Sequence, residues 1–188
     1  GSLYMNLPYQ GRLSKRFSLG LGGQTFSVVD GLLASLCVVS FAFSWVESCV
    51  NLDSHHWGLM YLQALDLKQG LIPHKEVVIF YGYLTTWLQS LSLMLLGERL
   101  LSIGLMTGLV YALSIALFYY LCQSFLPKSL SFLAALLMFL LHAYIISPWA
   151  NYFTYPFLLA SLIFCLNRDR SRYPAQLTLL SGVFAGLA

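Results

Sequence analysis

Long apolar runs separated by short polar segments dominate the chain. The runs with few or no charged residues cover 28–50, 100–121, 130–147, 149–166 and 175–188. An α-helix rises about 1.5 Å per residue, so the run 100–121 forms a helix of about 33 Å, enough to cross a bilayer core. We therefore predict that each of these ranges is a membrane-spanning helix. The first run is too long for the apolar core of a signal peptide, so we expect it to be retained.

The segment 51–99, between the first two predicted spans, is the polar part of the chain. Its early apolar residues recur at the spacing of one helix face: Trp57, Met60, Tyr61, Ala64 and Leu65. This spacing predicts an amphipathic helix. The opposite, polar face would hold Gln63, Asp66, Lys68 and Gln69. Gly70 is a typical helix-ending residue and Pro73 keeps the helix from resuming, so a turn is expected next.

The uncharged stretch 82–96 has two alternatives, a further span or a helix lying flat on the membrane surface. Positive residues favour the cytoplasmic side, so the distribution of Lys and Arg distinguishes the two. If the stretch lies flat, seven cations are cytoplasmic and three are exoplasmic: Arg12, Lys15, Arg16, Lys128, Arg168, Arg170 and Arg172 against Lys68, Lys75 and Arg99. If it spans, the balance becomes four against six. We therefore predict a flat helix, with the segment 51–99 on the exoplasmic side.

Composition supports the membrane class and excludes others. The chain is 59% hydrophobic and 9% charged, whereas a soluble domain carries about 25% charged residues. Its net charge is only +3, and the absence of a basic stripe excludes nucleic acid as a partner. The predicted fold is all-α, a polytopic membrane helix bundle with two juxtamembrane surface helices between the first and second spans. We assign 1–27, which begins with a tag-like Gly1-Ser2, to a tag and a cytoplasmic tail.

Candidate catalytic and metal-binding residues gather just after the first predicted span. Asp53 stands at the outer end of this span, where a carboxylate serves as a helix N-cap or a metal ligand. His55, His56 and Glu76 are ligand types that zinc and manganese accept, so a divalent metal site is one hypothesis. Adjacent side chains diverge on a helix, however, and histidines that hydrogen-bond water and lipid headgroups are the alternative.

Further polar residues lie near the two membrane boundaries. Lys75 and Arg99 are cations on the predicted exoplasmic side; they would hold a lipid phosphate or extend to the headgroups as ordinary snorkelling residues. Glu47 lies near the outer end of the first span, and we expect it to line the same cavity as Asp53 because charges inside membranes face protein or water. Asp30 is expected only to mark the cytoplasmic boundary.

Small residues recur at intervals of four in two of the predicted spans. They are Gly104, Gly108, Ala112 and Ala116 in one span, and Gly182 and Gly186 in the last. Small residues on one face allow two membrane helices to approach closely. We therefore predict that these positions serve helix packing rather than chemistry.

An ordered set of residues runs through the polar segment and into the second predicted span. It consists of Asp53, Gly58, Ala64, Leu67, Gly70, Pro73, Glu76 and Tyr81-Gly82-Tyr83-Leu84, followed by G-E-R-L-L-S at 97–102. This order resembles the opening of the GT-C superfamily of integral-membrane glycosyltransferases, which includes the protein mannosyltransferases and the aminoarabinose transferase of lipid A. The chain departs from the family pattern at Ser54, where many members carry Glu, and at Tyr83, where Pro is common.

The resemblance implies an enzyme that transfers a sugar from a polyprenyl-phosphate donor to an exoplasmic acceptor. Asp53 would be the general base or a metal ligand, Glu76 a second catalytic carboxylate, and a divalent metal ion the cofactor to consider. The implied location is a bacterial inner membrane with the site facing the periplasm. Members typically have eight or more spans, so the chain is expected to be an N-terminal module. The alternative is a non-catalytic membrane scaffold or a transporter-like subunit that retains this fold.

Overall fold

The structure is a computed structural model, and it describes residues 27–50, 54–80, 82–142, 146 and 148–188. The described part of the chain is all-α and contains no strand, which confirms the predicted fold class at this level. Its elements are α2 (Val28–Val50), α3 (Ser54–Lys68), α4 (Tyr83–Leu96), α5 (Leu100–Cys122), α6 (Lys128–His142), α7 (Ala150–Asn167), the 3-10 helix η1 (Arg168–Arg170) and α8 (Pro174–Leu187).

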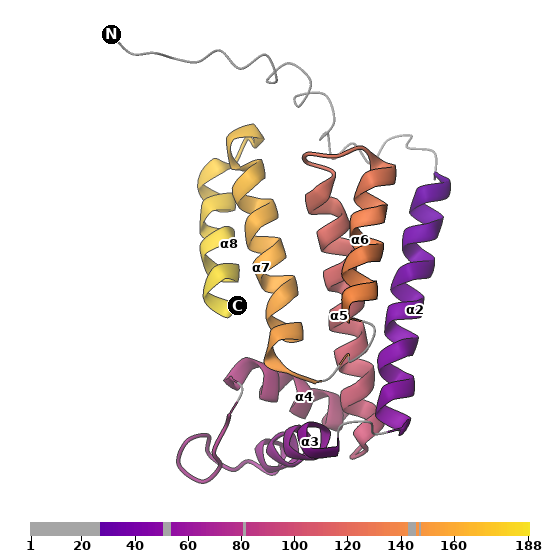
Figure 1. Ribbon diagram of the computed structural model, residues 1–188. Coiled ribbons are helices and arrows are strands. Elements are labelled where there is room, and N and C mark those ends of the chain that lie inside the picture. The colour runs from indigo at the N-terminus through magenta and orange to yellow at the C-terminus, as the bar shows by residue number, and fades with distance from the viewer. Residues whose placement is uncertain (1–26, 51–53, 81, 143–145, 147) are drawn as a thin grey trace.

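The helices have two orientations. Helices α2, α5, α6, α7 and α8 run roughly along one axis, whereas α3 and α4 lie across it at one end of the bundle (Figure 1). We call this end the α3/α4 end. Helix α4 has 14 residues and is about 21 Å long, which is shorter than a bilayer core of about 30 Å. The polar segment that follows α2 is therefore collected at one end of the bundle.

The amphipathic pattern predicted for α3 is confirmed on its apolar side and wrong at one polar position. Trp57, Met60 and Ala64 are buried, and the helix ends before Gly70, whose φ of 87° few other residues adopt. Gln63, predicted on the polar outer face, is only 3% exposed. Its Nε2 donates a hydrogen bond to the Val78 carbonyl oxygen at 2.9 Å, because the segment after α3 folds back over this side of the helix.

Close packing of α2 on α5 is confirmed at Gly104 and Gly108. A Cβ atom at Gly104 would collide with the Ser48 side chain, and one at Gly108 would lie 2.9 Å from the Phe41 carbonyl oxygen. Ser44 Oγ donates a hydrogen bond to the Gly104 carbonyl oxygen at 3.0 Å. In α8 the same four-residue spacing has no such role within the described residues, since a Cβ atom at Gly182 or Gly186 meets nothing within 4 Å.

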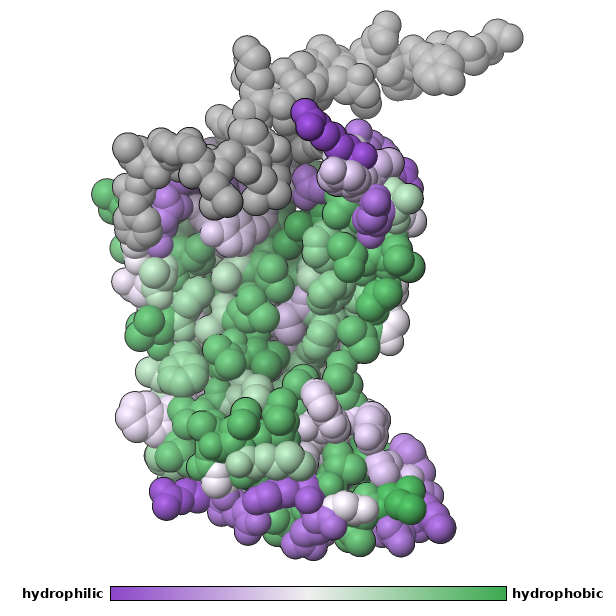
Figure 2. Space-filling view, turned by 180° about the vertical axis from the view of Figure 1, so that it is seen from behind, coloured by the Kyte–Doolittle hydropathy of each residue, from purple (hydrophilic) through white to green (hydrophobic). Residues whose placement is uncertain are grey.

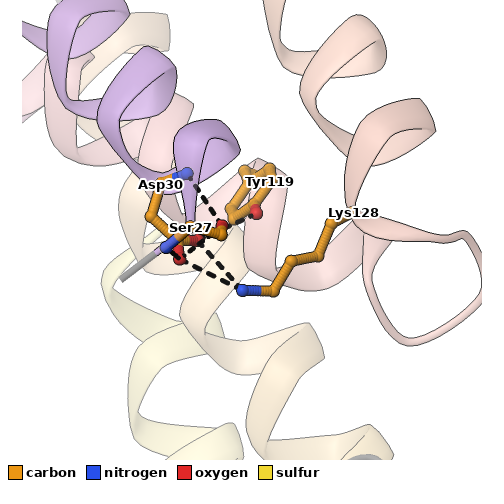
Figure 3. Close-up of polar contacts among 4 residues, drawn as sticks. All are labelled: Ser27, Asp30, Tyr119 and Lys128. Atoms are coloured by element: carbon orange, nitrogen blue, oxygen red, sulfur yellow. Dashed lines mark hydrogen bonds and ion pairs between the residues drawn. The ribbon is translucent and has the colours of Figure 1, made fainter. Parts of the chain in front are cut away.

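At the end opposite α3 and α4, one carboxylate joins three helices (Figure 3). Asp30 forms a capping box with Ser27, in which Ser27 N donates to Asp30 Oδ2 at 3.0 Å and Asp30 N donates to Ser27 Oγ at 3.3 Å. Lys128 Nζ at the start of α6 lies 3.1 Å from Asp30 Oδ2, and Tyr119 OH of α5 lies 3.5 Å from Oδ1. Asp30 thus fastens α2, α5 and α6 together, which the sequence analysis did not predict.

Apolar side chains cover the sides of the bundle and polar side chains fill parts of its interior. Figure 2 shows a broad hydrophobic middle with hydrophilic residues at both ends. In α4 the buried side chains are mostly polar: Thr85, Thr86, Gln89, Ser90, Ser92 and Leu93. Its exposed large side chains are Tyr83, Trp87, Met94, Leu95 and Leu96. This distribution is the reverse of that on a soluble protein, where apolar helix faces turn toward the core.

Candidate functional site

The first turn of α3 holds the two histidines next to the bundle. His55 is exposed and His56 is half-buried. The His56 ring packs against Trp149, which directly precedes α7, with ring centroids 5.1 Å apart, and His55 packs edge-on against His56 at 5.3 Å. The neighbouring histidines therefore have different environments, one toward the bundle and one toward its outside.

Glu76 and Lys75 share a compact turn between α3 and α4. Glu76 Oε2 accepts a hydrogen bond from the Ile72 amide at 2.8 Å, and His74, at the tip of the turn, has a φ of 59°. His74 N donates to the Val77 carbonyl oxygen at 2.8 Å. One carboxylate oxygen of Glu76 thus stabilises the turn, while the Lys75 side chain extends from it in an exposed position.

Arg99 is held at the start of α5 by contacts that its neighbour makes with α3. Glu98 Oε1 lies 2.8 Å from Lys68 Nζ, and Tyr61 OH donates to the Glu98 carbonyl oxygen at 3.2 Å. Because the Glu98 carboxylate pairs with Lys68, it does not offset the positive charge of the neighbouring, exposed Arg99 side chain. Within the described chain, neither Lys75 nor Arg99 forms an ion pair, so both are able to bind an anion.

A short segment before α7 connects the site to three other helices. Glu47, 6% exposed on α2, accepts a hydrogen bond from the Ile146 amide at 2.8 Å. From α4, Gln89 Nε2 donates to the Pro148 carbonyl oxygen at 2.9 Å, and α3 contributes the contact between His56 and Trp149 described above. Glu47 therefore lies at the α3/α4 end as a buried acceptor for a backbone amide, and the cavity that it was predicted to share with Asp53 lies outside the described residues.

Several buried polar atoms at this end have no hydrogen-bond partner among the described residues. They are Gln63 Oε1, Gln89 Oε1, Ser90 Oγ and Trp149 Nε1. A buried polar group without a partner costs about 1–3 kcal/mol, so such atoms are rare in folded proteins and often mark functional regions. Sequence reasoning missed Gln89 and Ser90. The polar residues inside the otherwise apolar stretch 82–96 were the available signal.

The predicted site residues are only partly brought together. His55, His56, Lys75, Glu76 and Arg99 all belong to the α3/α4 end, whereas Asp53 lies outside the described residues. No group of three His, Cys, Asp or Glu side chains at metal-binding distances occurs in the described ranges. A metal site that includes Asp53 stays a prediction.

No protein-family model, no curated protein and no solved structure matches this chain. Functional assignment therefore rests on the chemistry of the residues, on their arrangement and on the resemblance described for residues 53–102.

Proposed function

We propose that this chain is a membrane-embedded glycosyltransferase module that transfers a sugar from a polyprenyl-phosphate donor to an exoplasmic acceptor. One observation carries this proposal. Two histidines, a carboxylate and two exposed cations lie at one end of a helical bundle that exposes many large apolar side chains. That arrangement suits a substrate with a lipid tail in the bilayer and a charged phosphate at its surface.

The membrane placement is supported by the length of two helices and by what they expose. Helices α2 and α5 each have 23 residues and are apolar enough to cross a bilayer, while α6 and α8 are apolar but shorter. The core helix of a soluble protein also passes this test of length and composition. However, only 22% of the most apolar 18-residue stretch of α2 is buried inside the protein. The buried residues of this helix include Ser40, Ser44 and Ser48. Lipid is the solvent that favours this distribution.

The topology is tested by labelling one exposed residue at each end of the bundle. In a protein with its four native cysteines replaced, Gln69→Cys after α3 and Ser129→Cys in the first turn of α6 are both exposed. Because α5 alone would cross the membrane between them, we expect a membrane-impermeant thiol reagent to label Gln69→Cys from the exoplasmic side and Ser129→Cys only after permeabilisation. Labelling of both from one side would mean that α4 also crosses.

The proposed roles follow the chemistry of the α3/α4 end. Asp53 would act as the general base that removes a proton from the acceptor, or as a metal ligand, and Glu76 would be the second carboxylate. Lys75 and Arg99 would hold the phosphate of the donor through charge-assisted hydrogen bonds. As Glu76 already accepts the Ile72 amide, its second oxygen is the one that would face a substrate or a metal ion.

A divalent metal ion, held by Asp53, His55, His56 and Glu76, would balance the negative charge of the leaving phosphate. If this hypothesis holds, elemental analysis of the purified protein should find about one zinc or manganese ion per chain. His56→Ala should lose the ion, whereas His142→Ala should keep it, since the His142 ring on α6 packs against Tyr111 and Tyr152. Full transfer activity in excess chelator would leave the two histidines as interface residues.

The competing function is a non-catalytic scaffold or a transporter-like subunit. The hydrogen bond from the Ile72 amide to Glu76 favours it, because that contact gives the carboxylate a structural role. The two functions differ in one measurable property. The enzyme releases polyprenyl phosphate in proportion to the sugar it transfers, whereas a scaffold releases none from a labelled donor.

A further inference from the structure

The segment between α3 and α4 exposes large apolar side chains although it is not helical. Ile72 is 48% exposed, Val78 65% and Phe80 63%. The exposed face of α4 continues this pattern, with Trp87 at 46% and Leu95 at 71%. The sequence indicates only a turn here, yet the structure exposes large apolar side chains both in this segment and on the helix that follows it.

This surface rests on a turn that is held in one conformation. The amides of Lys75, Glu76 and Val77 all lie within 3.3 Å of the Ile72 carbonyl oxygen, and Gln63 Nε2 of α3 donates to the Val78 carbonyl oxygen. Val77 and Ile79, which alternate with the exposed residues, are buried at 8% and 7%. Alternate side chains thus anchor the segment to the protein, and Val78 and Phe80 are directed outward on a rigid support.

Two constraints fix the environment that suits this surface. In water, contiguous large apolar side chains are unfavourable and mark an interaction surface. In the hydrocarbon core, an irregular backbone is unfavourable because its polar groups lack the internal bonds of a helix. Both constraints are met at the boundary between headgroups and acyl chains. The polar tip of the turn is consistent with this position in the membrane, since the exposed His74, Lys75 and Glu76 would lie among the headgroups.

We propose that residues 71–80 and the exposed face of α4 form a lipid-binding surface at the boundary between headgroups and acyl chains. Val78, Phe80, Trp87 and Leu95 insert between lipid chains, and Lys75 lies at the level of the headgroup phosphates. Apolar faces of such interfacial elements are buried about 5–10 Å below the headgroups. The proposal rests on the membrane placement above but does not depend on whether the chain transfers sugar.

The experiment measures the depth of single spin labels in the full protein reconstituted into phosphatidylcholine vesicles. Labels are attached to cysteines at Phe80, Leu95, Leu109 and Gln69 in a background without native cysteines, and oxygen and a water-soluble nickel chelate serve as relaxation agents. We expect Phe80→Cys and Leu95→Cys to lie within about 5–10 Å of the phosphates. Leu109→Cys, exposed in the middle of α5, should lie deeper, and Gln69→Cys should be aqueous.

Each other outcome overturns a defined part of the account. An aqueous Phe80 label, as accessible to the nickel chelate as the Gln69 label, overturns the lipid-binding surface. A Phe80 label accessible to neither agent does so as well, because a protein partner then covers the segment. An aqueous Leu109 label contradicts the membrane placement itself, so the failure of the two proposals is distinguishable.

Discussion

Replacing Asp53 by Asn is expected to reduce sugar transfer at least about a hundredfold while the fold and donor binding are kept. The substitution preserves the size of the side chain, and Asn is as favourable a helix-capping residue as Asp. It removes the charge and the basicity, and general-base catalysis contributes typically about 10²–10⁴-fold. The measurement is the initial rate of transfer by the full-length protein from a polyprenyl-phosphate sugar, together with donor affinity.

The matched control is Asp66→Asn, the same chemical change on α3. Asp66 lies in the last turn of this helix, away from its first turn. It should transfer sugar at the rate of the wild type. If Asp53→Asn also retains the wild-type rate with the true donor, Asp53 is not the base.

Replacing Gly104 by Ala is expected to destabilise the folded protein by about 1–3 kcal/mol, the usual cost of overpacking. The new methyl group would collide with Ser48 and force α2 away from α5. That displacement would also weaken the hydrogen bond from Ser44 Oγ to the Gly104 carbonyl oxygen. The measurement is the unfolding free energy in detergent, and the expected sign is a loss.

Gly182→Ala supplies the comparison, because it makes the same change in α8, where a Cβ atom meets nothing within 4 Å. Alanine favours a helix over glycine by about 1 kcal/mol, so this variant is expected to be as stable as the wild type or more stable. Equal stability changes in the two variants would contradict the close packing of α2 on α5.

The sequence was most informative where a local pattern decides the structure. The helical spacing of Trp57, Met60 and Ala64 predicted the buried face of α3, and Gly70 predicted its end, because both depend on nearby residues alone. Helix α4 is a short crosswise helix at one end of the bundle (Figure 1). Its membrane depth stays a prediction that spin labels can test.

Contacts between distant segments were beyond the reach of the sequence. Gln63 looked exposed on a helical wheel, but the later segment containing Val78 covers it. Asp30 looked like a boundary marker, although Lys128 pairs with it across 98 positions of sequence. Equal spacing of glycines likewise predicted packing in both α5 and α8, since spacing does not say whether a partner helix lies opposite.

The most direct test of the central claim is a structure of the protein in a lipid nanodisc with a non-hydrolysable polyprenyl-phosphate analogue. The account predicts that the phosphate lies at the α3/α4 end, about 3 Å from Lys75 or Arg99, with the prenyl chain along the apolar surface. A folded protein that leaves the analogue unbound, or binds its phosphate at the opposite end near Asp30 and Lys128, would contradict the proposed function.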